Sequence, residues 1–310
     1  MRRVAILFNP VSGSGRAARI ADAVGRALID AGHDVRSVAT RRDPVATWMP
    51  AALADRDVAV VVGGDGAVRL TAGAAAAANV AIYHCPAGTE NLLARHLELR
   101  ARPECIVRAL AEGRIRRFDL GMFCDEPFVL MASFGFDADV VHALASRRSG
   151  AISHLSYAPV IARALVSWRA PSLAISLDGE PLVEIGQGVL VVANVPSYAF
   201  RLDPGRGAIP DDGLLDVTFL PCRSGLGAIR WAIEHFLRGG RVPGVARFRA
   251  ERLSVVIDRP AHCQLDGDPF VPADAASSSG ITAASIRVLR QVLPLVLPAT
   301  TSPDGIRRSD

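Results

Sequence analysis

Three short glycine-containing stretches of this chain have residue types suited to binding phosphate groups. They are NPVSGSGR at Asn9–Arg16, GGDG at Gly63–Gly66 and PAGTENLLAR at Pro86–Arg95. Each follows an apolar, β-branched run and leads into a helix-like stretch, and the backbone N–H groups at the start of a helix attract anions. The three loops together indicate one nucleotide or phosphorylated ligand along the edge of a parallel sheet.

Side chains in these loops fit more than one role. Asp65 is placed to bind a ribose hydroxyl, a metal-bound water or its own loop. The first loop lacks the GK[ST] ending of a Walker A loop. Its Ser12–Gly15 segment can still form a nest of N–H groups with Arg16 supplying charge, or Ser14 can cap the helix.

In the third loop, Thr89 can cap the following helix or hydrogen-bond an adenine or a phosphate. Asn91 and Arg95 lie one turn apart, so we expect them to share one helix face.

Two later motifs bring carboxylates. DDGLLDV at Asp211–Val217 places Asp212 in a tight turn, which suits Mg²⁺ or Ca²⁺ or is a plain turn. QLDGD at Gln264–Asp268 is a turn by default, and also a place for a general base over a cleft between two domains. Spacing alone does not select Asp266 over Asp268, Asp137 or Asp212 as that base.

The elements that must position these residues change character along the chain. Up to about residue 120, apolar strand-like runs alternate with helical patterns, which predicts a Rossmann-like α/β domain with a parallel sheet. We expect strands at Arg3–Phe8, Val35–Thr40, Val58–Val62 and Val80–His84, and helices at Arg16–Ala31, Val45–Ala54, Ala67–Ala78 and Asn91–Leu97.

From about Phe118, short strands separated by turns predict a mainly antiparallel β domain. Helices are expected there only near Asp139–Ser149, Ser156–Trp168 and Gly227–Leu237. The predicted domains are residues 1–120 and 121–290, followed by a C-terminal tail at 291–310. The helix at Ser156–Trp168 either packs on the β domain or dips into a membrane interface.

Composition excludes several classes of protein. Half of the 310 residues are apolar, no apolar run is long enough to span a membrane, and Met1–Val4 leads straight into a strand, so we expect no signal peptide. The five scattered cysteines indicate a reduced, cytoplasmic protein. No HxxxH or HxH pair and no GxSxG context occur, so neither a histidine metal site nor a hydrolase triad is expected.

Every basic residue is an arginine, and the net charge is only +4. This pattern fits phosphate binding, contact with an anionic membrane surface, or a GC-rich codon bias. No basic stripe is interleaved with aromatic residues, so nucleic-acid binding is not expected. A homodimer formed through sheet edges is compatible with the sequence, which contains no feature that decides it.

The ordered set of motifs, with SFGFDADV at Ser133–Val140 between them, resembles the diacylglycerol kinase catalytic family. That family includes bacterial lipid kinases and sphingosine kinases and is related to NAD kinases. The resemblance runs from about Val4 to Pro269. It implies an ATP-dependent lipid kinase, with a role in phospholipid biosynthesis, that phosphorylates a hydroxyl of diacylglycerol or a related lipid and contacts the inner membrane surface peripherally.

The resemblance, with the loop chemistry above, also implies site residues. The ATP-binding positions are Asn9, Pro10, Ser12, Gly13, Gly15, Arg16, Thr40, Gly63, Gly64, Asp65, Gly66, Arg69, Thr89 and Asn91. The Mg²⁺ site maps to Asp212, with main-chain help near Ile209 and Leu214. The family's base lies in the DG(E/D) turn, where we favour Asp266 and keep Asp268 as its rival.

The chain departs from the family pattern at three places. The family continues GGDGT with an Asn–Glu pair, whereas this chain has Ala67, then Arg69 and Leu70. The glycine-rich stretch after Asn194 is altered, and Asp268 replaces the usual glutamate. The alternatives are a catalytically weak or silent nucleotide- or lipid-binding homologue and an NAD-kinase-like phosphotransferase, although the latter's second glycine-rich segment is not found.

Overall fold

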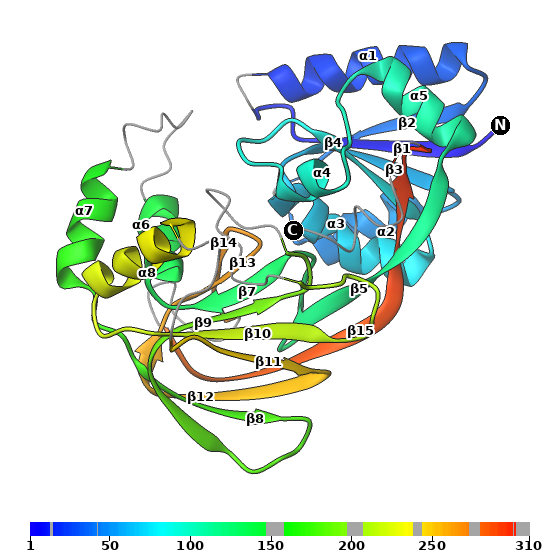
Figure 1. The fold of residues 1–310 in the computed structure, drawn as a ribbon. Helices are drawn as coiled ribbons and strands as arrows, with labels where there is room; N and C mark the ends of the chain where they lie inside the picture. The colour runs from blue at the N-terminus through cyan, green and yellow to red at the C-terminus, as the bar shows by residue number, and fades with distance from the viewer. Residues whose placement is uncertain are drawn as a thin grey trace. The chain divides into compact units, whose positions relative to one another are not determined.

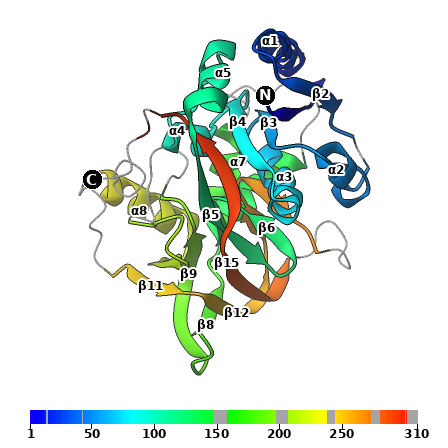
Figure 2. The ribbon, with the colours of Figure 1, turned by 90° about the vertical axis from the view of Figure 1, so that its right-hand side faces the viewer.

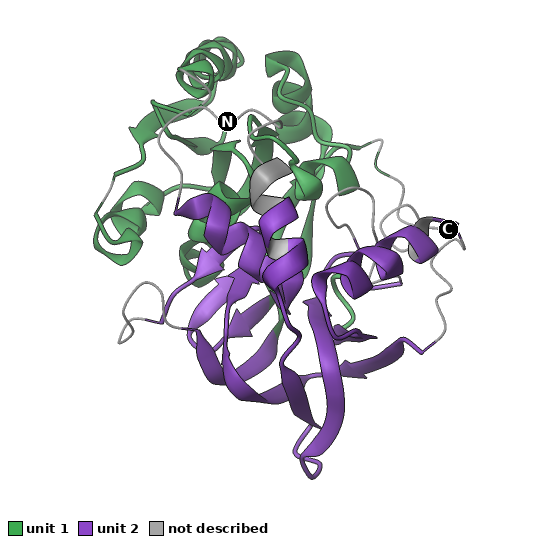
Figure 3. Ribbon diagram, turned by 90° about the vertical axis from the view of Figure 1, so that its left-hand side faces the viewer, with its two compact units in different colours: residues 1–120, 210–212, 289–310 green, residues 121–209, 213–288 purple. Residues whose placement is uncertain are grey.

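The computed structural model describes residues 1–12, 15–41, 43–146, 158–196, 207–237, 244–272, 280–299 and 301. The chain divides into two compact units (Figure 3). Unit 1 comprises residues 1–120, 210–212 and 289–310, and unit 2 comprises residues 121–209 and 213–288.

Unit 1 contains a parallel sheet in the strand order β4-β3-β1-β2 (Figure 1). Its strands are β1 (Arg3–Phe8), β2 (Asp34–Ala39), β3 (Val58–Gly63) and β4 (Ala81–Pro86). All residues of β3 are buried, as expected for a continuous apolar strand in a sheet covered on both faces.

Helices alternate with these strands. They are α1 (Arg16–Asp30), α2 (Val45–Leu53), α3 (Asp65–Ala78), α4 (Leu92–His96) and α5 (Pro103–Glu112). In α1, Ala17, Ala21, Val24 and Leu28 are buried at helical spacing, which gives the helix one apolar face. The predicted α/β fold is therefore confirmed, and α5 is an additional helix that the sequence patterns above do not predict.

Unit 2 is built from antiparallel strands, as the sequence predicts. The strands are β6 (Glu126–Phe128), β7 (Met131–Phe134), β8 (Ser172–Leu177), β9 (Val183–Ala193), β10 (Leu215–Pro221), β11 (Ala246–Ala250), β12 (Arg252–Ala261), β13 (Cys263–Leu265) and β14 (Asp268–Phe270). The stretch predicted as one strand at Pro127–Phe134 is divided into β6 and β7.

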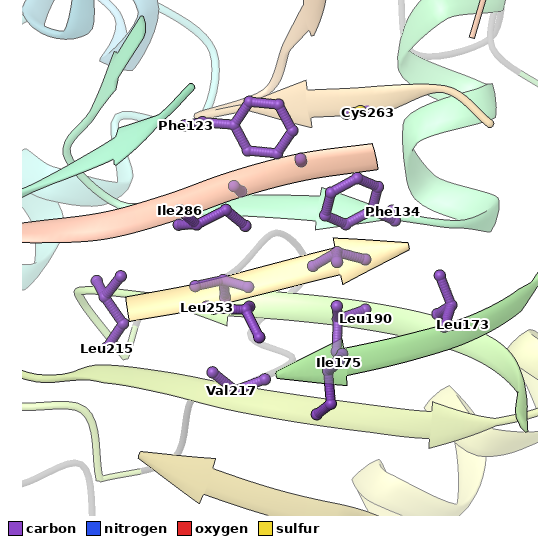
Figure 4. Packing of buried hydrophobic residues seen from close by; sticks show 14 of the residues in the cluster. Phe123, Phe134, Leu173, Ile175, Leu190, Leu215, Val217, Leu253, Cys263 and Ile286 are labelled. Carbon is purple, nitrogen blue, oxygen red and sulfur yellow. The ribbon is translucent and has the colours of Figure 1, made fainter. Parts of the chain in front are cut away.

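One apolar cluster joins these strands (Figure 4). Phe134, Leu190, Val217 and Leu253, from four different strands, are all buried in it. The rings of Phe123 and Phe134 pack with centroids 5.4 Å apart, a spacing typical of favourable aromatic pairs. This core fixes the strands from which the polar turns of unit 2 project.

The helices of unit 2 lie close to their predicted ranges, of which residues 147–149 and 156–157 lie outside the described residues. They are α6 (Phe136–Ala145), α7 (Ala158–Ser167) and α8 (Gly225–Leu237). Figure 1 shows the three helices grouped at one end of the strands of this unit, and α7 contacts both α6 and α8.

Strand β15 (Ile281–Leu297) differs from the expectation of a tail from residue 291. It pairs with β12, with β5 (Arg114–Phe123; Figure 2) and, at Leu295, in parallel with β4. Leu293, Leu295 and Val296 are fully buried, because this apolar run completes the edge of the parallel sheet.

Two of the predicted DG turns place two successive residues in the left-handed region. Asp178 and Gly179 have φ values of 50° and 87°, and Asp266 and Gly267 have φ values of 51° and 85°. Such left-handed pairs favour Asp-Gly and match the twist of the flanking strands. The second turn joins β13 to β14 and thereby fixes the position of Asp268.

Candidate functional site

The three glycine loops of unit 1 lie side by side. Strands β4, β3 and β1 are immediate neighbours and parallel, and each loop follows the carboxyl end of one of them. This edge of a parallel sheet is where α/β proteins commonly bind ligands. The tertiary structure thus brings together loops that are up to about 80 residues apart in the chain.

The first loop is ordered by its own asparagine. The Asn9 side-chain oxygen accepts a hydrogen bond from the Val11 N–H at 3.1 Å, and the Ser12 N–H donates to the Asn9 carbonyl at 3.1 Å. Gly15 has a φ of 83°, and helix α1 begins after it without a side-chain cap. Gly13 and Ser14 lie outside the described residues.

The second and third loops touch each other through glycines. A Cβ atom on Gly88 would lie 2.6 Å from the Gly64 Cα, so the two backbones approach too closely for a side chain there. The Asn91 side chain accepts from the Gly88 N–H at 2.9 Å and donates to the Gly88 carbonyl at 2.8 Å. Asn91 therefore shapes the third loop from within.

Asp65 closes the N-terminus of α4. Its two carboxylate oxygens accept hydrogen bonds from the Leu92 and Leu93 N–H groups at 2.9 and 3.0 Å. A carboxylate at a helix N-terminus is favourable because it meets unpaired N–H groups and the positive end of the helix dipole. Both oxygens of Asp65 thus contact backbone donors that follow the third loop, a role that the sequence analysis did not anticipate.

His84, in β4, contacts the backbone of the second loop, and the sequence analysis did not select this residue. The His84 Nε2 atom lies 3.0 Å from the Gly63 carbonyl oxygen, which can only accept, so Nε2 carries the proton. Complete burial lowers the pKa of His84 and keeps the ring neutral.

Ala67, which stands where the family has threonine, packs against the end of β3. A Cβ atom on Gly63 would lie only 2.6 Å from the Ala67 Cβ, so Ala67 lies directly against the glycine that ends β3. The Ala67 N–H donates to the Gly64 carbonyl at 3.0 Å, and two residues later Arg69 is partly exposed on α3.

The remaining predicted nucleotide positions lie at or beside the same edge. Pro10 and Thr89 are exposed in the first and third loops. Thr40 follows β2 and donates its N–H to the Phe8 carbonyl at 2.8 Å. Gly66 lies in the first turn of α3, and Arg16 is the exposed first residue of α1.

The segment that carries Asp212 is anchored in unit 1 by polar contacts. Arg116 forms an ion pair with Asp211, and Gln291 donates its side-chain N–H to the Asp211 carbonyl at 3.0 Å. Fully buried Asp119 donates its N–H to the Pro210 carbonyl at 2.6 Å and accepts from the Gln291 N–H at 2.7 Å. This anchoring explains why residues 210–212 belong to unit 1 although their neighbours belong to unit 2.

Asp212 itself is exposed in this segment. Within the described part of the chain, no group of three or more His, Cys, Asp or Glu side chains is arranged to hold a metal. Ile209 and Leu214, which flank the Asp212 turn, offer only carbonyl oxygens. The available donors are one carboxylate and main-chain oxygens, a set that suits a hard cation completed by water and phosphate oxygens.

In unit 2, the Asp266 carboxylate is held by three backbone donors. The Val129 N–H donates to Oδ2 at 2.7 Å, and the Leu130 and Met131 N–H groups donate to Oδ1 at 2.8 Å each. The side chain is buried, with 7% of the residue exposed. These contacts explain why the strand predicted at Pro127–Phe134 is interrupted, because the chain turns around this carboxylate.

Three buried polar side chains complete the support of this turn. The Gly267 N–H donates to the Gln264 side-chain oxygen at 2.7 Å, and the Gln264 amide donates to the Ser133 hydroxyl at 2.8 Å. Ser133 in turn donates to Asp137. On the other side, the Asn194 amide donates to the Val129 carbonyl at 2.9 Å.

Asp268 differs from Asp266 in its environment. It is the first residue of β14, opposite Leu265, and it is partly exposed. Because the turn before it is rigidly held, the position of its Cα is well defined. The sequence located both carboxylates but gave no sign that one of them holds the turn together.

The altered stretch after Asn194 cannot be compared with the family pattern, because residues 197–206 lie outside the described residues. The structure does show what sequence reasoning missed nearby. Asn194 and Gln264 are buried and hydrogen-bonded. Gln264 is a polar residue within β13, and Asn194 directly follows the apolar end of β9, which is the signal that could have found them.

A parallel α/β unit with adjacent glycine loops, together with an antiparallel β unit, defines the two-domain fold of the NAD kinase-like class of kinases. The structure of yeast NADH kinase complexed with NADH aligns with a TM-score of 0.50 at 11% identity, covering 98% of this chain and 86% of that chain. A diacylglycerol kinase structure from Bacillus anthracis str. Sterne aligns with a TM-score of 0.67 at 16% identity, covering 97% and 98%.

The sequence comparisons agree with the fold. Residues 3–123 match the diacylglycerol kinase catalytic domain, and residues 131–296 match the YegS C-terminal NAD kinase beta sandwich-like domain. The diacylglycerol kinase of Mycobacterium tuberculosis, in strains CDC 1551 / Oshkosh and ATCC 25618 / H37Rv, is 27% identical over 299 residues, covering 93% of this chain and 95% of the relative. The chain therefore belongs to the family that combines a diacylglycerol kinase catalytic domain with a YegS C-terminal NAD kinase beta sandwich-like domain. Among its described residues, no helix is both long and apolar enough to cross a membrane.

Proposed function

We propose that the protein is an ATP-dependent lipid kinase that phosphorylates a hydroxyl group of diacylglycerol or a related lipid. The observation that carries this proposal is the set of three adjacent glycine loops in a chain of the diacylglycerol kinase family. The carboxylates of the DGD turn in unit 2 provide the second requirement, a proton acceptor for the hydroxyl.

The helices that follow the loops differ in whether the N–H groups at their N-termini are open to the ATP phosphates. Helices α1 and α3 both begin without a side-chain cap, whereas the N-terminus of α4 is closed by Asp65. We therefore assign the phosphates to the first loop and to Gly63–Gly66. At Gly64 and Gly88 the close contact between the second and third loops leaves only backbone, which fits the close approach of a bulky anionic ligand.

Mg²⁺ fits the donor chemistry of the Asp212 turn. One carboxylate with main-chain oxygens near Ile209 and Leu214 is a hard, oxygen-only donor set, and Mg²⁺ commonly combines such a set with phosphate oxygens and water. When bound, the ion would offset negative charge on the phosphates. The ion pair of Arg116 with Asp211 holds the turn that presents Asp212.

We assign the general base to Asp268 and the positioning of the turn to Asp266. A base must come within hydrogen-bonding distance of the hydroxyl that it deprotonates. Both oxygens of Asp266 are engaged by buried N–H groups, whereas Asp268 is partly exposed. This reverses our preference from the sequence, which had placed Asp266 first.

Exposed apolar side chains support contact between unit 2 and a lipid surface. Val166 on α7 and Leu226 and Leu237 on α8 each have at least two thirds of their surface exposed. Exposed apolar side chains on helices are a feature of proteins that bind membranes peripherally. The contacts of α7 with α6 and α8 also agree with the simpler role of packing on the unit.

The test is phosphate transfer from labelled ATP to a panel of micellar lipids and to NAD. Label in one lipid, lost in Asp268→Asn, would support the proposal and identify the acceptor. Label in NAD would instead indicate an NAD-kinase-like phosphotransferase. Measurable ATP binding without any transfer would indicate a silent homologue, in which Ala67 and Arg69 replace residues that the reaction requires.

A further inference from the structure

Unit 2 contains a pocket whose lining lies almost entirely outside the motifs, since only Asp139 belongs to one of them, SFGFDADV. It has a volume of about 540 Å³ and lies between α6, α7, the segment after α7 and the end of β12. This volume falls within the range of pockets that bind small organic molecules. Its lining includes Asp139, Arg163, Trp168, Arg169, Arg259 and His262.

The charge of this pocket is predominantly positive. Arg163, Arg169 and Arg259 line it, against a single acidic residue, Asp139. That carboxylate is already engaged, because its Oδ1 atom lies 2.6 Å from the His262 Nδ1 atom. None of the three arginines forms an ion pair with another described residue.

Two of the arginines are fixed by the backbone. The Arg259 Nη2 atom donates to the Arg169 and Ala170 carbonyls at 2.7 Å, and the Arg169 Nη1 atom donates to the Val166 and Trp168 carbonyls at 3.0 Å. A guanidinium group has five N–H donors, so these contacts orient each group and use only some of its donors. Arg169 and Arg259 are therefore organised before any ligand binds, which lowers the entropic cost of binding.

Aromatic rings and prolines also form part of the pocket wall. Trp168 is almost completely buried and packs edge-on against Phe136, with ring centroids 5.8 Å apart. The His262 ring stacks on the His142 ring with centroids 4.2 Å apart, and this contact holds the His262 ring beside Asp139. Pro171 and Pro260 add rigid apolar surface. The pocket thus combines three arginines, two of them fixed by the backbone, with apolar walls.

We propose that this pocket binds the phosphate group of a phosphate ester, through residues of unit 2 that are distinct from the loops assigned to ATP. Arginine is the side chain best suited to this role, because its planar donors match phosphate oxygens in pairs. The pocket has room for organic atoms attached to the phosphate, as in sn-glycerol 3-phosphate. The ester can come from the headgroup of an anionic phospholipid or from a soluble metabolite.

The test measures binding to the full-length protein without nucleotide, so its result does not depend on kinase activity. Binding of sn-glycerol 3-phosphate is followed by isothermal titration calorimetry at fixed ionic strength. We expect Arg163→Gln and, separately, Arg169→Gln to weaken it about tenfold, the loss of roughly one charge-assisted contact. Arg247→Gln, which removes the same charge from exposed strand β11, should change it less than twofold.

Cosedimentation with vesicles separates the two sources of the ester. Stronger binding to vesicles of phosphatidylcholine with 20% phosphatidylglycerol than to phosphatidylcholine alone, reduced in Arg163→Gln, would assign the pocket to a lipid headgroup. Binding of sn-glycerol 3-phosphate without such a vesicle preference would assign it to a soluble ester. The proposal is overturned if neither probe binds, or if Arg247→Gln weakens binding as much as Arg163→Gln does. Arg163 is exposed and its guanidinium has no described hydrogen bond, so misfolding is not expected to obscure the result.

Discussion

Replacing Asp266 by asparagine separates a structural role from a chemical one. The Asp266 carboxylate accepts three backbone N–H groups at 2.7 to 2.8 Å, and asparagine preserves the shape of the side chain but only one of its two acceptors. If the amide oxygen takes the place of Oδ1, the Leu130 and Met131 donors keep a partner. The amide N–H₂ group then faces the Val129 N–H, and two donors oppose each other.

The expected cost follows from these contacts. A hydrogen bond to a charged acceptor contributes about 1.5 to 3 kcal/mol, and a buried N–H left without an acceptor costs about 1 to 3 kcal/mol. We therefore expect the free energy of unfolding of unit 2 to fall by about 3 kcal/mol. In a unit of this size each kcal/mol lowers the melting temperature by about 2 to 4 °C, so the shift is roughly 6 to 12 °C.

Asp268→Asn is the matched control, because it removes the same charge two residues away on a partly exposed side chain. We expect its melting temperature to stay within about 3 °C of the wild type, while phosphate transfer is lost. Circular dichroism melting curves and the transfer assay on both variants give the comparison. If Asp266→Asn melts like the wild type but does not transfer phosphate, Asp266 takes part in the chemistry and our reasoning is refuted.

Three further changes test unit 1. Asp65→Ala removes both acceptors from the N-terminus of α4, so we expect a loss of about 1 to 2 kcal/mol in urea unfolding and weaker ATP binding by calorimetry. Gly88→Ala places a Cβ atom 2.6 Å from the Gly64 Cα, and should cost about 1 to 3 kcal/mol in the same unfolding assay. Burial lowers the pKa of His96 to about 4. Below pH 6.5, His96 therefore binds a proton in the unfolded chain but stays neutral in the folded chain until the pH nears 4. Its contribution to the free energy of unfolding should fall by about 3 kcal/mol between pH 7 and pH 4, measured by urea unfolding across that range.

Each of these changes has a control within unit 1. Asp22→Ala removes a carboxylate from the exposed face of α1 and should change stability by less than about 0.5 kcal/mol. Gly25→Ala meets its nearest neighbour at 3.5 Å and should stabilise α1 by up to about 1 kcal/mol. His96→Gln should remove the pH-dependent difference. Equal effects of Gly25→Ala and Gly88→Ala, or an unchanged pH dependence in His96→Gln, would contradict the assignments.

The sequence alone determined most of the local structure. The strands β1 and β3 and the helices α1 and α2 lie within two residues of their predicted bounds, because each has a clear apolar pattern and a distinct break at its ends. The turns at Asp178–Gly179 and Asp266–Gly267 were equally predictable, since few residue pairs other than Asp-Gly favour two successive left-handed positions. The alternation of elements was enough to predict an α/β unit followed by an antiparallel β unit.

Only the tertiary structure decided what each polar side chain contacts. Asp65 binds N–H groups 27 and 28 residues away, and Asp266 binds N–H groups more than 130 residues away. No local pattern encodes such partners, because a carboxylate in a glycine turn has the same sequence signature whether it faces a ligand or a backbone donor.

The same reason applies to β15 and to the arginine pocket. The apolar end of β15 became a strand because β4 offered an open edge, a condition that exists only once the sheet has formed. Nothing in the sequence distinguishes Arg163, Arg169 and Arg259 from other surface arginines. The packing of α6, α7 and β12 brings these three side chains around one pocket. Local chemistry therefore fixed the elements and the motifs, whereas contacts between distant segments fixed the roles of the charged side chains.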